Sequence, residues 1–156
     1  MENITKFTGR LLVSAAILLA ACSSYSNPTG PAPKPTITPS TIAGNWVVSS
    51  LIQRTEDKSS DFSGFTFTFA AGGGESGTVT AVHNGTTVSG TWVHSPASAS
   101  YYGGTSTAET MSLNLGSSTP LDRLTGTWNV ESSTGANLTL VNPEAQEQEQ
   151  LVFAKQ

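Results

Sequence analysis

The sequence predicts an all-β domain that folds as a small, eight-stranded antiparallel up-and-down barrel. Three observations support this fold class: apolar and polar residues alternate with period two, Thr, Ser and Gly are abundant, and the alternating segments are joined by short connections. Because side chains two apart on a strand share one face, such alternation indicates strands with one apolar face. Eight strands can close into a barrel, and a flattened sandwich is the alternative closure.

The individual strands are assigned from this alternation. It is clearest in "FTFTF" (65–69), "MSLNL" (111–115) and "WNVE" (128–131). No long segment of the sequence shows the 3.6-residue period of a helix. Short connections favour a meander in which neighbouring strands pair. The expected strands span about 45–52, 64–70, 76–83, 87–94, 109–115, 125–132, 136–141 and 149–155.

One hairpin can be given a register. Asn84-Gly85 is a strong turn signal, because both central residues of a type I′ turn need a positive φ. This turn pairs His83 with Thr86. Counting outward predicts three opposed pairs on one face of the hairpin: Ala81 and Val88, Val79 and Gly90, and Gly77 and Trp92. The largest ring would therefore face a glycine, which leaves room for it.

A single short helical turn is expected near 119–124. The segment reads "TPLDRL", in which Thr119 would be the N-cap and Pro120 the first helical residue. Asp122 follows three residues after the cap, where an acidic side chain completes a capping pattern.

The first 21 residues have the layout of a secretory signal peptide. Lys6 and Arg10 give a weakly positive start, an apolar run spans 11–21, and Ala20 and Ala21 end it. This run of eleven residues is too short for a transmembrane helix, which needs ~20 apolar residues.

The only cysteine of the chain, Cys22, follows this run directly. Leu19-Ala20-Ala21-Cys22 resembles the lipobox of bacterial lipoproteins. The resemblance implies cleavage before Cys22, a thioether-linked diacylglycerol on its sulfur, and an acyl chain such as palmitate on its new amino group. Several chains on one residue make a lasting membrane anchor. Because Ser23 follows, the family implies a lipid-anchored protein of the outer membrane that faces the periplasm or the cell surface.

Residues 22–41 are expected to be a lipidated N-terminus and tether, since 23–41 holds five of the eight prolines. Residues 42–156 suffice for one domain with one core. Beyond residue 21, five basic residues face ten acidic ones, which argues against nucleic acid or an anionic lipid surface as a partner.

All three tryptophans occur in G-x-W: Gly44-Asn45-Trp46, Gly90-Thr91-Trp92 and Gly126-Thr127-Trp128. The first lies on the first expected strand, and the domain there resembles the lipocalins and the lipocalin-like domains of bacterial lipoproteins. The likeness continues through "FTFTF", "GTVTA", "MSLNLG" and "LVFAK". It implies a calycin-like barrel whose first tryptophan closes one end. Trp92 and Trp128 are expected to form core.

The candidate binding residues follow from the resemblance and from one loop. A barrel interior that accepts an apolar ligand would be lined by aromatic side chains, and paired loop tyrosines often form contact surfaces. The candidates are Trp46, Phe65, Phe67, Phe69, Trp92, Tyr101 and Tyr102.

No residue pattern predicts catalysis, a cofactor or a metal. The G-x-G-x-x-G match at 72–77 precedes a strand and is expected to be a hairpin loop. Ser76 and His94 would point to opposite faces of the hairpin, while His94 would contact Glu75 across the strands. His83 and His94 would lie roughly 27 Å apart, too far to share one ion.

These observations lead to a non-enzymatic, membrane-anchored lipoprotein. Its lipocalin-like domain would bind a small apolar ligand or a protein partner. One alternative is a periplasmic protease inhibitor of small-barrel type, which would use the segment before Trp46 to block a protease cleft. Another is a purely structural envelope lipoprotein.

Overall fold

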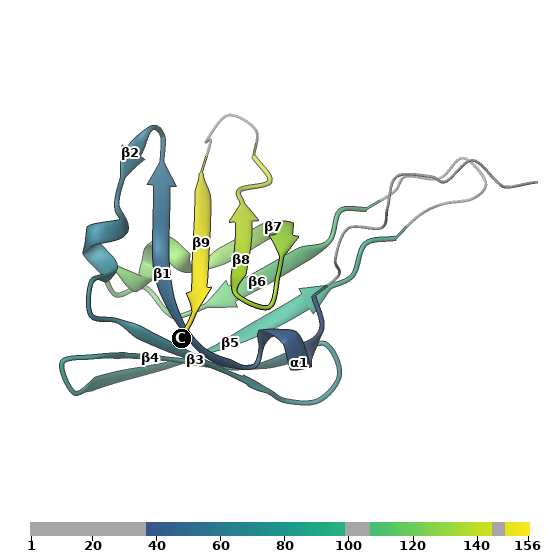
Figure 1. Ribbon diagram of the computed structural model, residues 1–156, viewed down its shortest axis with the longest axis horizontal. Helices are drawn as coiled ribbons and strands as arrows, with labels where there is room; N and C mark the ends of the chain where they lie inside the picture. Colours follow the sequence, from purple (N-terminus) through teal and green to yellow (C-terminus); the bar gives the residue numbers. More distant parts are fainter. Residues whose placement is uncertain (1–36, 99–106, 145–148) are drawn as a thin grey trace, which may run out of the picture. The chain divides into compact units, whose positions relative to one another are not determined.

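The structure is a computed structural model that describes residues 37–98, 107–144 and 149–156. The described residues all belong to one compact unit of the chain, Pro33–Gln156. Strands make up more than half of the described residues, and the helices among these residues are single turns (Figure 1). They are α1 (Pro39–Ile42) and two 3₁₀ turns, η1 (Ser59–Phe62) and η2 (Leu121–Leu124).

The strands form one antiparallel sheet that closes on itself. Each strand pairs with its neighbour in the order β2-β1-β3-β4-β5-β6-β7-β8-β9, and β9 also pairs with β1. Figure 1 shows β9 beside β1 at this closure. The strands are β1 (Gly44–Gln53), β2 (Glu56–Asp57), β3 (Thr66–Ala71), β4 (Ser76–His83), β5 (Thr86–Ser95), β6 (Thr110–Asn114), β7 (Gly126–Ser133), β8 (Asn137–Val141) and β9 (Gln150–Lys155).

The predicted eight-stranded up-and-down barrel is confirmed, and the bounds of its strands agree with the predicted ranges to within about two residues. β2 is an additional strand of two residues that the alternation did not predict. It pairs with the end of β1 through a two-residue turn at 54–55. Closure through β1 and β9 leaves no long unpaired edge on the barrel strands.

The register predicted for the hairpin at Asn84-Gly85 is also confirmed. All four predicted pairs, from His83 with Thr86 to Gly77 with Trp92, are partners in the β4–β5 pairing. A Cβ atom at residue 77 would lie 2.7 Å from Trp92 Nε1, so glycine is what permits the ring to occupy this position.

The helical turn near 119–124 forms, but its N-terminus differs from the prediction. η2 begins at Leu121, so Pro120 occupies the N-cap position and no side chain caps the turn. The Thr119 hydroxyl donates to Asp122 Oδ2 at 3.3 Å instead of accepting a backbone N–H. Because the turn starts one residue late, Thr119 is not its N-cap.

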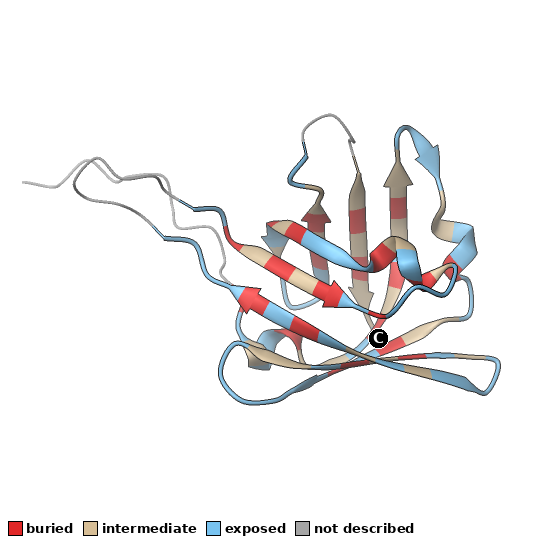
Figure 2. Cartoon of the chain, turned by 180° about the vertical axis from the view of Figure 1, so that it is seen from behind, coloured by how far each residue is buried: buried red, intermediate tan, exposed pale blue. Residues whose placement is uncertain are grey.

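Apolar side chains fill the barrel in one continuous cluster. Its largest members include Trp46, Trp92, Trp128, Phe67 and Phe153, all nearly inaccessible to solvent. Figure 2 shows how buried residues alternate with more exposed ones along the strands. Ile37 belongs to the same cluster, although it lies in the segment predicted as tether. The packed part of the chain therefore begins at least five residues before the expected boundary at 42.

The barrel has two ends, named here for the helical turns that lie on them. Because successive strands are antiparallel and an odd number of pairings separates β1 from β7, these two strands begin at opposite ends. The α1 end holds the start of β1 and the end of β5. The η2 end holds the start of β7, the turn at 84–85 and the β1–β2 turn at 54–55.

Candidate functional site

An open cleft of about 340 Å³ lies at the η2 end; we call it the apolar cleft. It forms where the β4–β5 hairpin faces the segment that leads into η2. Ala81 and Val88 point to the inner face of the sheet and form part of the cleft wall; Ala81 is buried and Val88 is partly buried. The lining residues are Phe65, Ala81, His83, Asn84, Thr86, Val88, Ser118, Thr119, Pro120 and Leu121.

Two rings form one wall of the apolar cleft. Phe65 stacks on His83 with ring centroids 4.3 Å apart and planes tilted by 9°. The His83 Nε2 atom lies 3.2 Å from Asn84 Nδ2, which places polar groups at the rim. Phe65 and Val88 are only partly buried and pack against the core. The cleft thus combines an apolar floor with a polar edge, the usual make-up of a small-molecule site.

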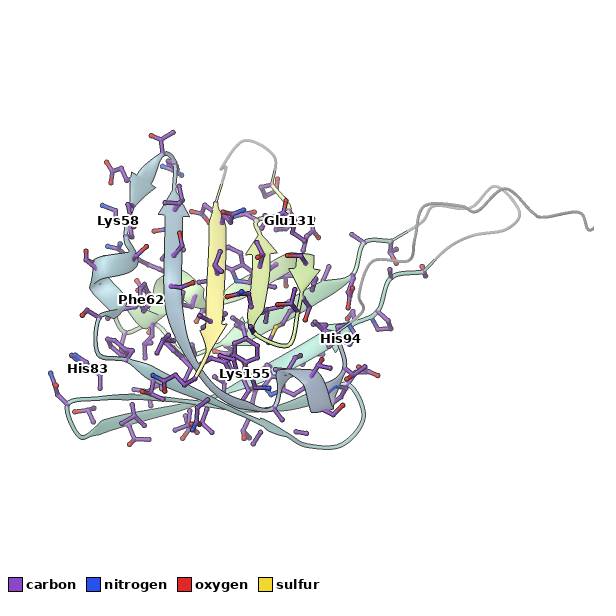
Figure 3. The ribbon with its side chains drawn as sticks, viewed as in Figure 1. Lys58, Phe62, His83, His94, Glu131 and Lys155 are labelled. Atoms are coloured by element: carbon purple, nitrogen blue, oxygen red, sulfur yellow. The ribbon has the colours of Figure 1, made fainter. Side chains whose placement is uncertain are left out.

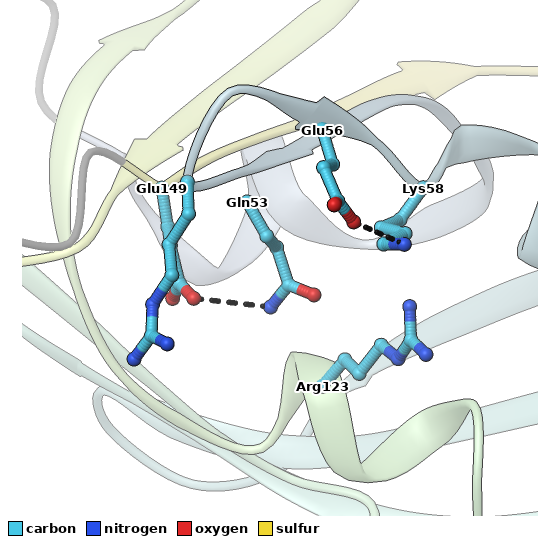
Figure 4. A pocket seen from close by; sticks show the side chains of 6 residues that line it. Gln53, Glu56, Lys58, Arg123 and Glu149 are labelled. Atoms are coloured by element: carbon cyan, nitrogen blue, oxygen red, sulfur yellow. Dashed lines mark hydrogen bonds and ion pairs between the residues drawn. The ribbon is translucent and has the colours of Figure 1, made fainter.

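A second opening at the η2 end, of about 420 Å³, is charged; we call it the charged cleft (Figure 4). Arg123 comes from η2, and its Nη1 donates to Asp61 Oδ2 at 2.7 Å. Lys58 Nζ lies 2.5 Å from Glu56 Oε2. The lining residues are Gln53, Arg54, Glu56, Lys58, Arg123 and Glu149.

Carboxylates at the η2 end are held in their charged forms by these contacts. The hydrogen bond and positive charge of Lys58 lower the pKa of Glu56. The pKa of Asp57 is also lowered, first by the Ser59 hydroxyl and then by the Ser59 backbone N–H, which donate to Oδ1. Both carboxylates are exposed to solvent.

At the α1 end, a histidine is buried between two carboxylates. His94 Nδ1 lies 2.6 Å from Glu75 Oε2, and His94 Nε2 lies 2.8 Å from Glu109 Oε1. The same Glu109 oxygen accepts the backbone N–H of Ile37 at 2.8 Å. The predicted contact between His94 and Glu75 is therefore confirmed. The network joins β5, the β3–β4 loop, the residue before β6 and the segment before α1.

Sequence reasoning missed Glu109, although a signal was present. Glu109 is in phase with Met111 and Leu113, and His94 is in phase with Trp92, so both polar residues occupy inward positions of neighbouring strands. An inward acid beside an inward histidine predicts a buried pair.

Most of the aromatic residues predicted to bind a ligand are part of the core. Trp46, Phe67, Phe69 and Trp92 are buried, at 2 % exposure or less, and Trp128 at 3 % is core as predicted. Among the predicted ligand-binding side chains that the structure describes, Phe65 is the one that lines a cleft. Tyr101, Tyr102 and the lipidation residue Cys22 lie outside the described residues.

The histidines and Ser76 are not arranged for shared chemistry. His83 and His94 lie at opposite ends of the β4–β5 hairpin (Figure 3). The Ser76 hydroxyl donates to the Gly73 carbonyl at 3.1 Å, while both ring nitrogens of His94 contact carboxylates. Residues 37–98, 107–144 and 149–156 contain no group of three His, Cys, Asp or Glu side chains that could hold a metal ion. Over the same ranges, every helix is too short or too polar to span a bilayer.

Comparison with known proteins gives no relative: no family model matches the chain, and neither the curated proteins nor the solved structures contain a significant match.

Proposed function

We propose that this protein is a non-enzymatic lipoprotein of the outer membrane, anchored through lipidated Cys22, whose barrel binds a small apolar ligand at the apolar cleft. The observation that carries the proposal is the cleft itself: a ligand-sized opening with Phe65, Val88 and Leu121 among its walls. The signal-peptide and lipobox patterns support the anchor.

The proposal places the ligand at the η2 end and not in the barrel interior. Phe67, Trp92 and Phe153 occupy that interior and have no exposed surface. Interiors this closely packed resist the insertion of additional atoms. An apolar ligand at the cleft would instead cover side chains that are already partly accessible, such as Phe65 and Val88.

Two valines on β5 provide a matched test. Val88 lines the apolar cleft, whereas Val93 lies on the outer face with 46 % of its surface exposed. Val88→Phe should fill the cleft, and Val93→Phe adds the same atoms elsewhere. The probe is N-phenyl-1-naphthylamine, an uncharged dye that fluoresces in apolar surroundings. Saturable fluorescence of the full chain should be lost in Val88→Phe and kept in Val93→Phe, and equal binding by both variants would refute the site.

The anchor is tested separately. Cells fed with labelled palmitate should incorporate label into the native chain and not into Cys22→Ser, and the native chain should fractionate with the outer membrane. Because this experiment does not involve the barrel, its failure would remove the anchor and leave the cleft untouched.

If the protein is instead a protease inhibitor, the packing of the N-terminal segment limits which residues could enter the protease cleft. Ile37 and Ile42 are buried in the core, and the Ile37 backbone is bonded to Glu109. A deletion of 28–43 would therefore damage the barrel itself. Removing 28–36 is the cleaner test, because it should abolish protease inhibition while the barrel stays folded.

A further inference from the structure

One opening of this acidic protein gathers most of the described basic side chains, together with two carboxylates, Glu56 and Glu149. The chain has a net charge of −4, and the described residues include four basic side chains. Three of them, Arg54, Lys58 and Arg123, line the charged cleft. The fourth, Lys155, is at the α1 end, with Nζ 5.1 Å from the centre of the Trp46 ring.

The carboxylates of the charged cleft are already engaged. Glu56 pairs with Lys58, and Glu149 accepts hydrogen bonds from Gln53 Nε2 at 3.2 Å and from Asn142 Nδ2 at 2.9 Å. Arg123 uses Nη1 for Asp61, but a guanidinium carries five N–H donors. Arg123 therefore retains donors for a ligand. Figure 4 shows Arg123 and Lys58 extending toward the same space.

The turn that carries Arg54 is strained in a way that the other turn at this end is not. Arg54 and Thr55 have φ values of 49° and 78°, and Asn84 and Gly85 have the same two values. Asn-Gly is the preferred sequence for this backbone, whereas a β-branched residue such as threonine is an outlier there. Strain of this kind clusters at ligand clamps. This strained turn places Arg54 in the lining of the cleft.

We propose that the charged cleft binds the oxyanion group, phosphate or carboxylate, of a small molecule. Arg123 would supply paired N–H donors, while Lys58 and Arg54 would add positive charge. The opening of about 420 Å³ has the size of a small-molecule pocket, larger than one inorganic ion requires. This site is separate from the apolar cleft, and its existence does not depend on the function proposed above.

Calorimetric titration of the full chain at low ionic strength tests the site with two probes. Inorganic phosphate presents the free anion, and dihexanoyl-phosphatidylglycerol, kept below its micelle concentration, presents a lipid headgroup. Arg123→Gln and Lys58→Gln should each weaken binding by about tenfold, the loss expected for one hydrogen bond to a charged group. Lys155→Gln removes the same charge at the other end and should change the affinity by less than about twofold, because salt screens distant charges.

A fourth variant guards against loss of folding. Arg54→Asn with Thr55→Gly gives this turn the sequence of the turn at 84–85, so the barrel should be at least as stable while binding weakens. Saturable binding of either probe that follows this pattern supports the site, and the tighter probe identifies the source of the oxyanion. Absence of heat from both probes at millimolar concentration, or equal weakening in Lys155→Gln, would overturn it.

Discussion

The two ends of the barrel place their ionisable side chains in different environments. At the α1 end, the His94 side chain is 1 % exposed and lies between two carboxylates, one of which also fixes the Ile37 backbone. At the η2 end, the Arg123–Asp61 and Lys58–Glu56 pairs are solvent-accessible and border the charged cleft. Buried pairs resist rearrangement, whereas exposed pairs exchange partners readily. The ionisable side chains of the α1 end, His94 and Glu109, are thus held in a buried network, whereas those of the η2 end are accessible from solvent.

Both ends nevertheless share one structural device, which we call the tryptophan corner. In each, a helical turn is followed by a glycine of positive φ, Gly44 at 132° or Gly126 at 152°. Two residues later a tryptophan donates its Nε1–H to the last helical carbonyl: Trp46 to Ile42 at 2.7 Å, and Trp128 to Leu124 at 3.1 Å. The two ends are thus closed by the same geometry and differ in the charges around it.

The largest effect is expected from breaking the buried network. Glu109→Ala leaves the His94 ring and the Ile37 N–H without their buried acceptor, which should lower the free energy of unfolding by about 3 kcal/mol. Asp61→Ala breaks the exposed pair with Arg123 at the other end and should cost less than about 1 kcal/mol. Urea denaturation of both variants measures the difference.

A conservative substitution separates charge from shape. Glu109→Gln keeps an oxygen that can accept both hydrogen bonds and removes the ionisable group, so its cost should lie between that of Glu109→Ala and the native chain. Equal stability of Glu109→Ala and Asp61→Ala would contradict the contrast between the ends.

The tryptophan corners should respond alike. Trp46→Phe and Trp128→Phe each remove a buried N–H donor and part of a ring, at a cost of about 2 kcal/mol. Thermal unfolding followed by circular dichroism provides the comparison. If one substitution proves nearly silent while the other is severe, the two corners are not equivalent closures.

Substitutions in the turns at 54–55 and 84–85 should change the free energy of unfolding by smaller amounts and in opposite directions. Thr55→Gly should stabilise the barrel by about 0.5–1 kcal/mol, because relief of the left-handed strain exceeds the added chain entropy of glycine. Gly85→Thr places the same outlier in the other turn and should destabilise by a similar amount. Midpoints of urea unfolding at constant slope measure both, and destabilisation by Thr55→Gly would argue against strain at residue 55.

The features that the sequence predicted correctly are those that depend on residues close together in the chain. Period-two alternation and the Asn84-Gly85 turn act within a few residues, so strands and register could be predicted without long-range information. The clefts could not, because they depend on residues such as Lys58 and Arg123 that the closed barrel brings together. The turn at 54–55 was missed for a different reason: Arg-Thr opposes the backbone that it adopts. Sequence patterns thus failed mainly at the end where the candidate sites lie.

The smallest expected effect concerns the pH dependence of the Glu56–Lys58 pair at the η2 end. Lys58 lowers the folded-state pKa of Glu56, so Glu56 contributes stability above its unfolded pKa, near 4.5, and loses it as the pH falls through the lower folded value. Carboxyl titration by NMR should show that Lys58→Gln moves the pKa of Glu56 up toward 4.5. The pKa of Asp57 should stay low, because Ser59 holds it. An equal rise in the pKa of Asp57 would mean that the charge of Lys58 acts on all nearby carboxylates and not through its contact with Glu56.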